Sequence, residues 1–191
     1  MTKMTQVKVV IVGDTKVGKS CILSKYVQGT FDKNLPATVG AALLTKVIQT
    51  PNGSVRLQLW DTAGQEKFRA LSPMYYRSAD VAVLVYDITS KSTLEALEDW
   101  SAEIADKAPP NIKLVVIGNK NDLEKERCIS FQQGKEIANQ LGATIYGETS
   151  AVTGDGINEI FGKIAQLDFT QDIVIQTQTP VTRPEEGNKC C

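Results

Sequence analysis

The sequence predicts an α/β domain with a six-stranded, mostly parallel sheet, one antiparallel hairpin strand and helices on both faces. Strand-like apolar runs alternate with helix-length segments, at residues 7–12, 42–48, 55–60, 81–87, 113–118 and 143–147. Only the second and third runs lack a helix between them, and the turn-forming residues 50–54 predict a hairpin there. Runs 81–85 and 114–117 are apolar without alternation, which is typical of central strands covered on both faces.

Helix signals fall between these strands. Ser92 to Glu95 has the form of a capping box, and the apolar face that follows it holds Leu94, Leu97 and Ile104. Ser130 to Gln133 is a weaker example of the same box. The last helix is expected to bury Ile157, Ile160, Phe161 and Ile164. Periodicity ends at residue 169, so we expect one domain over residues 1–169 and a flexible tail over 170–191.

The composition restricts the chemistry. The chain has 191 residues, a formal net charge of −1 and no histidine, which excludes a Ser/His/Asp triad and most zinc sites. No block of like charge favours nucleic acid as a partner, and no apolar run approaches the roughly 18 residues that span a bilayer. The cysteines show neither a zinc pattern nor a secreted disulfide framework, and they stand at 21, 128, 190 and 191. We therefore expect a reduced, cytosolic environment.

A phosphate-binding loop is predicted directly after the first strand. The pattern is Gly-x-x-x-x-Gly-Lys-Ser, formed by Gly13, Asp14, Thr15, Lys16, Val17, Gly18, Lys19 and Ser20. Glycines allow backbone N–H groups to converge on phosphate oxygens at the start of the next helix. We expect Lys19 to neutralise the β- and γ-phosphates and Ser20 to bind Mg²⁺ through its hydroxyl.

The end of the third strand adds a second candidate group. Asp61 stands where it can hold Mg²⁺ directly or through water, although a carboxylate at such a position is also a common turn or helix cap. Gly64 is small enough for its N–H to approach a γ-phosphate. Gln65 can orient an attacking water by accepting and donating hydrogen bonds, which suits a chain without histidine.

The ends of the last two strands predict recognition of guanine. Asp122, in the segment Asn119 to Asp122, can accept both the N1–H and the N2–H₂ donors of guanine, whereas adenine would leave its carboxylate unpaired. Ser150 and Ala151 follow the sixth run, where a backbone N–H can donate to the guanine O6.

Together these residues resemble a small Ras-like GTPase and, more closely, the Rab family, over essentially residues 6–169. The match rests on several motifs in the family's order, namely Gly13 to Ser20, Thr38, Asp61 to Gln65, Asn119 to Asp122 and Ser150 to Ala151. Segments that are similar to Rabs in particular are 39–42, 56–60, 67–71, 75–77 and 86–89, with the ending Cys190-Cys191. Leu43 departs from the usual phenylalanine and Val152 from the usual lysine.

The resemblance implies a P-loop NTPase fold and a switch in vesicle traffic that cycles between GTP and GDP. Its catalytic residues would be Gln65, Lys19, Thr38 and Gly64, with Mg²⁺ held by Ser20, Thr38 and, through water, Asp61. Nucleotide contacts would come from residues 13–20, Cys21, Phe31, Thr38, Gly64, Asn119, Lys120, Asp122, Ser150 and Ala151. Thr15 would lie near the γ-phosphate and crowd an arginine finger, which predicts slow intrinsic hydrolysis.

The resemblance also implies partners and a membrane anchor. An exchange factor, a GTPase-activating protein, a GDP-dissociation inhibitor and effectors would bind through residues 31–45 and 61–77, and we expect a monomer. The tail has two basic and three acidic side chains, so it lacks a polybasic patch and needs prenyl groups on both Cys190 and Cys191. The expected location is the cytoplasmic face of intracellular membranes, endosomal by the run 40–42, with a cytosolic pool.

Two alternative functions stay open on the sequence alone. One is a guanine-nucleotide-locked binding module with little hydrolysis, against which Gln65 argues because it supplies a group that orients water. The other is a different P-loop phosphotransferase such as a small kinase, against which the guanine-reading segment Asn119 to Asp122 argues.

Overall fold

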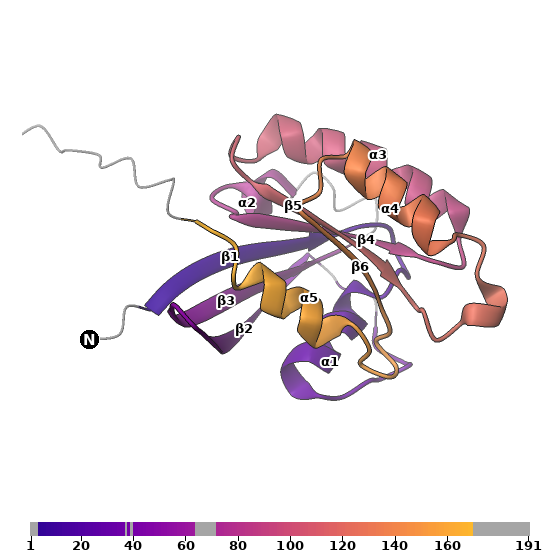
Figure 1. Ribbon diagram of the computed structural model, residues 1–191, viewed down its shortest axis with the longest axis horizontal. Helices are drawn as coiled ribbons and strands as arrows, with labels where there is room; N and C mark the ends of the chain where they lie inside the picture. The colour runs from indigo at the N-terminus through magenta and orange to yellow at the C-terminus, as the bar shows by residue number, and fades with distance from the viewer. Residues whose placement is uncertain (1–3, 37, 39, 64–71, 170–191) are drawn as a thin grey trace, which may run out of the picture.

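The computed structural model describes residues 4–36, 38, 40–63 and 72–169. These residues form one six-stranded sheet in the order β2-β3-β1-β4-β5-β6 (Figure 1). The strands are β1 (Met4–Val12), β2 (Ala41–Thr50), β3 (Gly53–Thr62), β4 (Val81–Asp87), β5 (Lys113–Asn119) and β6 (Ile145–Thr149). Only β2 runs antiparallel, paired with β3, which confirms the predicted fold class.

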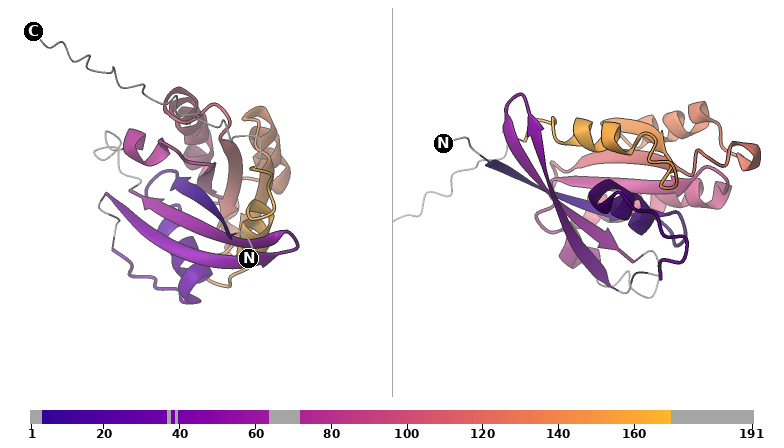
Figure 2. Two further views of the ribbon diagram at one scale, coloured as in Figure 1. Left: turned by 90° about the vertical axis from the view of Figure 1, so that its left-hand side faces the viewer. Right: turned by 90° about the horizontal axis from the view of Figure 1, so that it is seen from below.

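Helices cover both faces of this sheet. One face carries α1 (Lys19–Gln28) and α5 (Ile157–Ile164), and the other carries α2 (Ser72–Tyr76), α3 (Lys91–Lys107) and α4 (Phe131–Gln140) (Figure 1). A short 3₁₀ helix, Glu124–Glu126, lies between β5 and α4. The long β2–β3 hairpin forms one side of the domain and turns close to the start of β1 (Figure 2).

The side chains of β1 show how the two faces divide. Val9 and Ile11 pack in the cluster that includes α1 and α5, whereas Val10 and Val12 pack in the cluster that includes α3. This alternation follows from the two-residue period of a strand. Every residue of β4 is buried, as its unbroken apolar run predicts for a central strand.

Several predicted boundaries were wrong. β1, β2 and β3 begin or end up to three residues beyond their predicted ranges. The last strand begins at Ile145 and not at 143, because the N–H of Ala143 donates to the carbonyl of Ala138 and so belongs to the end of α4. The helix predicted to be capped by Ser92 begins at Lys91, and Ser90 is the residue that flanks it. Ser92 therefore lies inside the helix, so the expected capping box does not form. The Thr93 hydroxyl donates to the Ser90 carbonyl.

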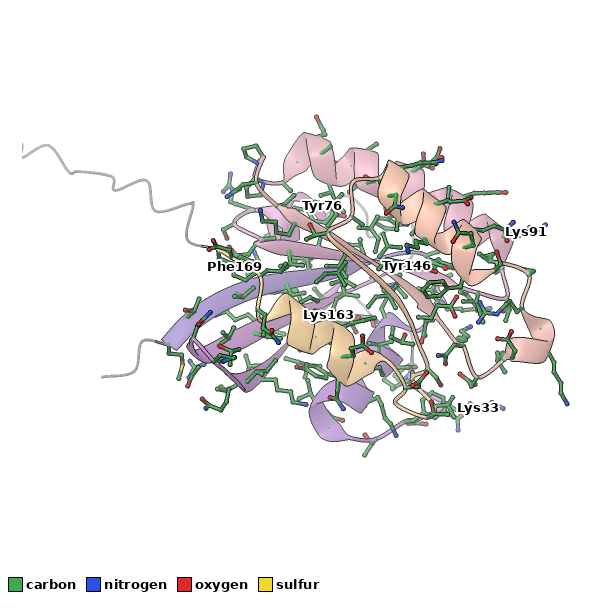
Figure 3. The ribbon with its side chains drawn as sticks, in the orientation of Figure 1. Lys33, Tyr76, Lys91, Tyr146, Lys163 and Phe169 are labelled. Atoms are coloured by element: carbon green, nitrogen blue, oxygen red, sulfur yellow. The ribbon has the colours of Figure 1, made fainter. Side chains whose placement is uncertain are left out.

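The weaker capping box, in contrast, does form. The Ser130 hydroxyl accepts a hydrogen bond from the Gln133 N–H, and the Gln133 side chain accepts one from the Ser130 N–H. This cap starts α4 over β6, where Tyr146 lies beneath the helix (Figure 3) and donates to the carbonyl of Phe131. The predicted stripe of α5 is also confirmed, since all four of its apolar residues are buried.

The sheet order brings the candidate loops together. β1 lies between β3 and β4 in the sheet. Strands that follow β1 in the chain therefore lie on both sides of it, and the strand order reverses at this point. Loops that follow the carboxyl ends of parallel strands at such a point form the usual ligand crevice of an open α/β sheet. The loops after β1, β3, β5 and β6 all leave from this edge.

Candidate nucleotide-binding site

Two glycines allow the loop between β1 and α1 to lie close against the sheet. Gly13 has a φ of 136°, and a Cβ there would lie 2.3 Å from the carbonyl oxygen of Val85. Gly18 has a φ of 99°, and its Cβ would lie 2.3 Å from Nδ2 of Asn119. Only glycine satisfies both the backbone angle and the close approach. The predicted phosphate loop therefore lies directly over β4 and β5.

Lys19 places a buried ammonium inside this loop. Its Nζ donates to the carbonyl oxygens of Gly13 at 2.7 Å and Asp14 at 2.8 Å, and the residue is 6% exposed. Burial lowers the pKa of Lys19 to about 8, although the carboxylates of Asp61 and Asp14 oppose the shift. A phosphate at the loop would offset this desolvation, because a nearby anion favours the charged form of lysine.

Three oxygen-bearing side chains converge beside Lys19 and fit a magnesium ion. The Ser20 and Thr38 hydroxyl oxygens are 2.8 Å apart, and the Thr38 hydroxyl donates to Oδ2 of Asp61 at 3.1 Å. Oδ1 of Asp61 is buried and accepts no hydrogen bond from the part of the chain that is described. Burial raises the pKa of Asp61, opposed by hydrogen bonds from Ser20 and Thr38 and by the charge of Lys19. Hydroxyl and carboxylate oxygens are the ligands Mg²⁺ prefers.

Lys19, Ser20 and Thr38 line a cavity of about 300 Å³. Thr15, Lys16 and Cys21 line it from the loop and the start of α1, and Leu35, Pro36 and Thr38 line it from the segment before β2. The Thr15 side chain is exposed. Phe31 is 37% exposed on the same connecting segment between α1 and β2.

Asn119, at the end of β5, joins three of the candidate loops. Its Nδ2 donates to the carbonyl of Val17 at 2.8 Å, and its Oδ1 accepts from the Thr149 hydroxyl at 3.0 Å. The residue is 1% exposed. The phosphate loop, the end of β5 and the end of β6 are thus fixed to one another by a single buried amide.

The loop after β5 is tied to the loop after β6. The Asn121 N–H donates to the carbonyl of Thr149, and its side chain donates to Asp155 at 2.7 Å. Lys120 has a φ of 73° and its ammonium forms an ion pair with Asp87. Asp122 follows at the exposed rim of this loop.

Ser150 shapes the loop after β6 from within. Its hydroxyl oxygen accepts the N–H groups of Val152 and Thr153, both at 3.1 Å, and the residue is fully buried. Ala151 is 5% exposed, whereas Val152 points outward and is 47% exposed. The departure at Val152 therefore leaves the fold of this loop intact.

Other predicted residues lie away from this crevice or outside the described residues. Leu43 is 50% exposed on β2, directly opposite Trp60 of β3, and the Trp60 and Tyr75 ring centroids are 6.0 Å apart. Leu43 therefore lies beside this aromatic pair. Gly64, Gln65 and the tail, including Cys190 and Cys191, lie outside the described residues.

Two side-chain pairs at the site were missed by sequence reasoning. Arg127 forms two hydrogen bonds of 2.7 Å with the carboxylate of Glu148, immediately before the loop that contains Ser150. Hydrogen bonding to Glu148 raises the pKa of Arg127. Trp100 of α3 donates its indole N–H to the Asp14 side chain. No local sequence pattern marks either pair, because the partners are distant in the chain.

Among the described residues, no helix is both long enough and apolar enough to cross a membrane.

Comparison with known proteins identifies the family. Residues 8–168 match the Ras family. The Homo sapiens protein named Ras-related protein Rab-22A is 43% identical over 163 residues, which cover 85% of this chain and 84% of the relative. The Mus musculus and Canis lupus familiaris proteins of the same name are 42% and 43% identical over the same shares. The chain therefore belongs to the Ras family and, within it, to the Rab small GTPases.

Proposed function

We propose that the protein is a switch that binds GTP and GDP with Mg²⁺, hydrolyses GTP slowly and recruits effectors in intracellular vesicle traffic. The single observation that carries the proposal is the convergence of two half-sites at one edge of the sheet. The buried ammonium of Lys19 and the oxygens of Ser20, Thr38 and Asp61 form the first half. The loops joined by Asn119 form the second.

The proposed roles follow from chemistry at each half-site. Lys19 binds the β- and γ-phosphates, and the N–H groups of residues 13–20 surround them. Asp122 accepts the paired donors of guanine, and the backbone at Ala151 donates to its O6. Asn119 and Lys120 hold these loops in place, and Phe31 lies edge-on to the base. A Mg²⁺ ion held by Ser20, Thr38 and, through water, Asp61 would supply charge neutralisation between the phosphates.

Hydrolysis and switching depend on the third phosphate. Gln65 orients the attacking water, and Thr38 and Gly64 bind the γ-phosphate only when GTP is present. Release of these two contacts after hydrolysis changes the surface formed by residues 31–45 and 61–77, where the exchange factor, activating protein, GDP-dissociation inhibitor and effectors dock. Thr15 crowds the position of an arginine finger, and intrinsic hydrolysis is slow. Most acceleration comes from a partner.

Single-turnover hydrolysis tests this activity. Purified protein loaded with GTP should release phosphate at a rate on the order of 10⁻³ s⁻¹ or below, as other GTPases of this class do without an activating partner. The Gln65→Leu variant should be slower still while it retains GTP. A wild-type rate near one per second would refute the slow timer, and equal rates in both proteins would favour the nucleotide-locked binding module.

The membrane attachment is proposed from the tail sequence. Prenyl groups on Cys190 and Cys191 would hold the protein on the cytoplasmic face of a membrane, because one chain binds only marginally without a basic cluster. The resemblance of residues 40–42 to endosomal Rabs favours that compartment. Stable membrane fractionation of Cys190→Ser with one lipid on Cys191 would contradict the need for two chains.

A further inference from the structure

The contact between α3 and the phosphate loop has no role in the function proposed above. Nε1 of Trp100 donates to Oδ1 of Asp14 at 3.0 Å, across 86 residues of sequence. Trp100 is 3% exposed and packs in the cluster that contains Val10, Leu97 and Ile104. The indole N–H is a donor only, and a buried one needs an acceptor. Asp14 supplies that acceptor from within the loop.

A carboxylate at this point of the loop opposes the binding of phosphate. Asp14 directly follows Gly13, and its own backbone carbonyl accepts a hydrogen bond from the Lys19 ammonium. Its carboxylate also lies close enough to Lys19 to favour the charged form of that lysine. An Asp14 side chain free to turn toward Lys19 would compete with phosphate for the ammonium and repel the incoming anion.

The hydrogen bond from Trp100 limits this competition. α3 covers the face of the sheet opposite to α1, the helix that begins with Lys19 (Figure 1). The hydrogen bond to Trp100 therefore directs the Asp14 carboxylate toward α3. The Lys19 ammonium donates to the carbonyl oxygens of Gly13 and Asp14, and among the described residues it makes no hydrogen bond to the Asp14 carboxylate.

We propose that Trp100 is a positioning residue for nucleotide binding, which acts by holding the Asp14 carboxylate away from the phosphate site. The inference rests on the proposed function, since it assigns Trp100 a part in the same phosphate site. It predicts that the effect of Trp100 on affinity depends on the negative charge at position 14.

A double-mutant cycle measures that dependence. GDP affinity, with Mg²⁺ present, is measured for the full chain and for Trp100→Phe, Asp14→Asn and the double variant. Because the released Asp14 carboxylate would compete with phosphate for the Lys19 ammonium, Trp100→Phe should weaken GDP binding by about 5- to 20-fold. In the Asp14→Asn background the same change should alter the affinity less than about twofold, because the uncharged amide no longer competes for Lys19.

A second buried residue of α3 serves as the matched control. Ile104→Val removes one methyl group from the same cluster without touching the loop, so it should lower the unfolding midpoint and leave GDP affinity unchanged. An equal loss of affinity for Trp100→Phe in both backgrounds, or a loss of affinity in Ile104→Val as well, would overturn the inference. Failure of the wild-type chain to bind GDP would instead overturn the proposed function and the inference with it.

Discussion

Asn119→Ala should destabilise the fold by removing the amide that joins three loops. The side chain makes two buried hydrogen bonds, of 2.8 Å to the Val17 carbonyl and 3.0 Å from the Thr149 hydroxyl. Each bond contributes about 1–1.5 kcal/mol, and leaving its partner unpaired in a buried site adds to the cost. We therefore expect the free energy of unfolding to fall by about 2–4 kcal/mol.

Thr149→Val is the matched control for this change, because it preserves side-chain shape and removes only one of the two bonds. It should cost about half as much as Asn119→Ala, about 1–2 kcal/mol. Urea unfolding in excess EDTA without nucleotide separates the fold from ligand binding. If Asn119→Ala cost no more than Thr149→Val, or if both fell below about 0.5 kcal/mol, the amide would not join the loops as argued.

Three further predictions test other contacts. Gly134→Ala would place a Cβ 2.1 Å from the Tyr86 hydroxyl oxygen and 2.3 Å from that of Tyr146. The free energy of unfolding in urea should therefore fall by about 1–3 kcal/mol. Substitution of both tyrosines by phenylalanine should reverse most of this loss, because it removes the two hydroxyl groups. The pKa of Lys19 is lowered to about 8, and bound phosphate would raise it. GDP binding should therefore be accompanied by proton uptake near pH 8–9 and should weaken as the pH rises through about 8, which calorimetry in buffers of different ionisation enthalpy measures. Proton release on binding in that range would contradict this assignment. Asp61→Asn should require at least about tenfold more Mg²⁺ for retention of GDP, and an unchanged Mg²⁺ dependence would remove Asp61 from the metal site.

The elements of the fold could be predicted because each depends on a short-range pattern. Unbroken apolar runs mark β4 and β5, and the turn residues 50–54 mark the β2–β3 hairpin. Boundaries that depend on tertiary contacts could not be predicted in this way. Ala143 was assigned to β6 by its apolar character, but its N–H completes the end of α4.

The candidate site also contains contacts that could be predicted from the sequence and contacts that could not. Lys19, Ser20 and Asp61 were predicted to lie together because each stands at the carboxyl end of a strand or the start of the following helix, and the structure brings them together. The role of Asn119 as a buried link to Val17 was not predicted, because that hydrogen bond spans 102 residues. The partners of such bonds are set by the packing of the sheet and leave no local signal.

The central claim is that the site is specific for guanine nucleotides, and competition between GDP, ADP and xanthine diphosphate tests it most directly. The wild-type protein should prefer GDP strongly over both competitors. Asp122→Asn should shift the preference toward xanthine diphosphate, because an amide can donate to the 2-oxo group of xanthine whereas a carboxylate cannot. Equal binding of ADP and GDP by the wild type, or an unchanged preference in Asp122→Asn, would contradict the claim.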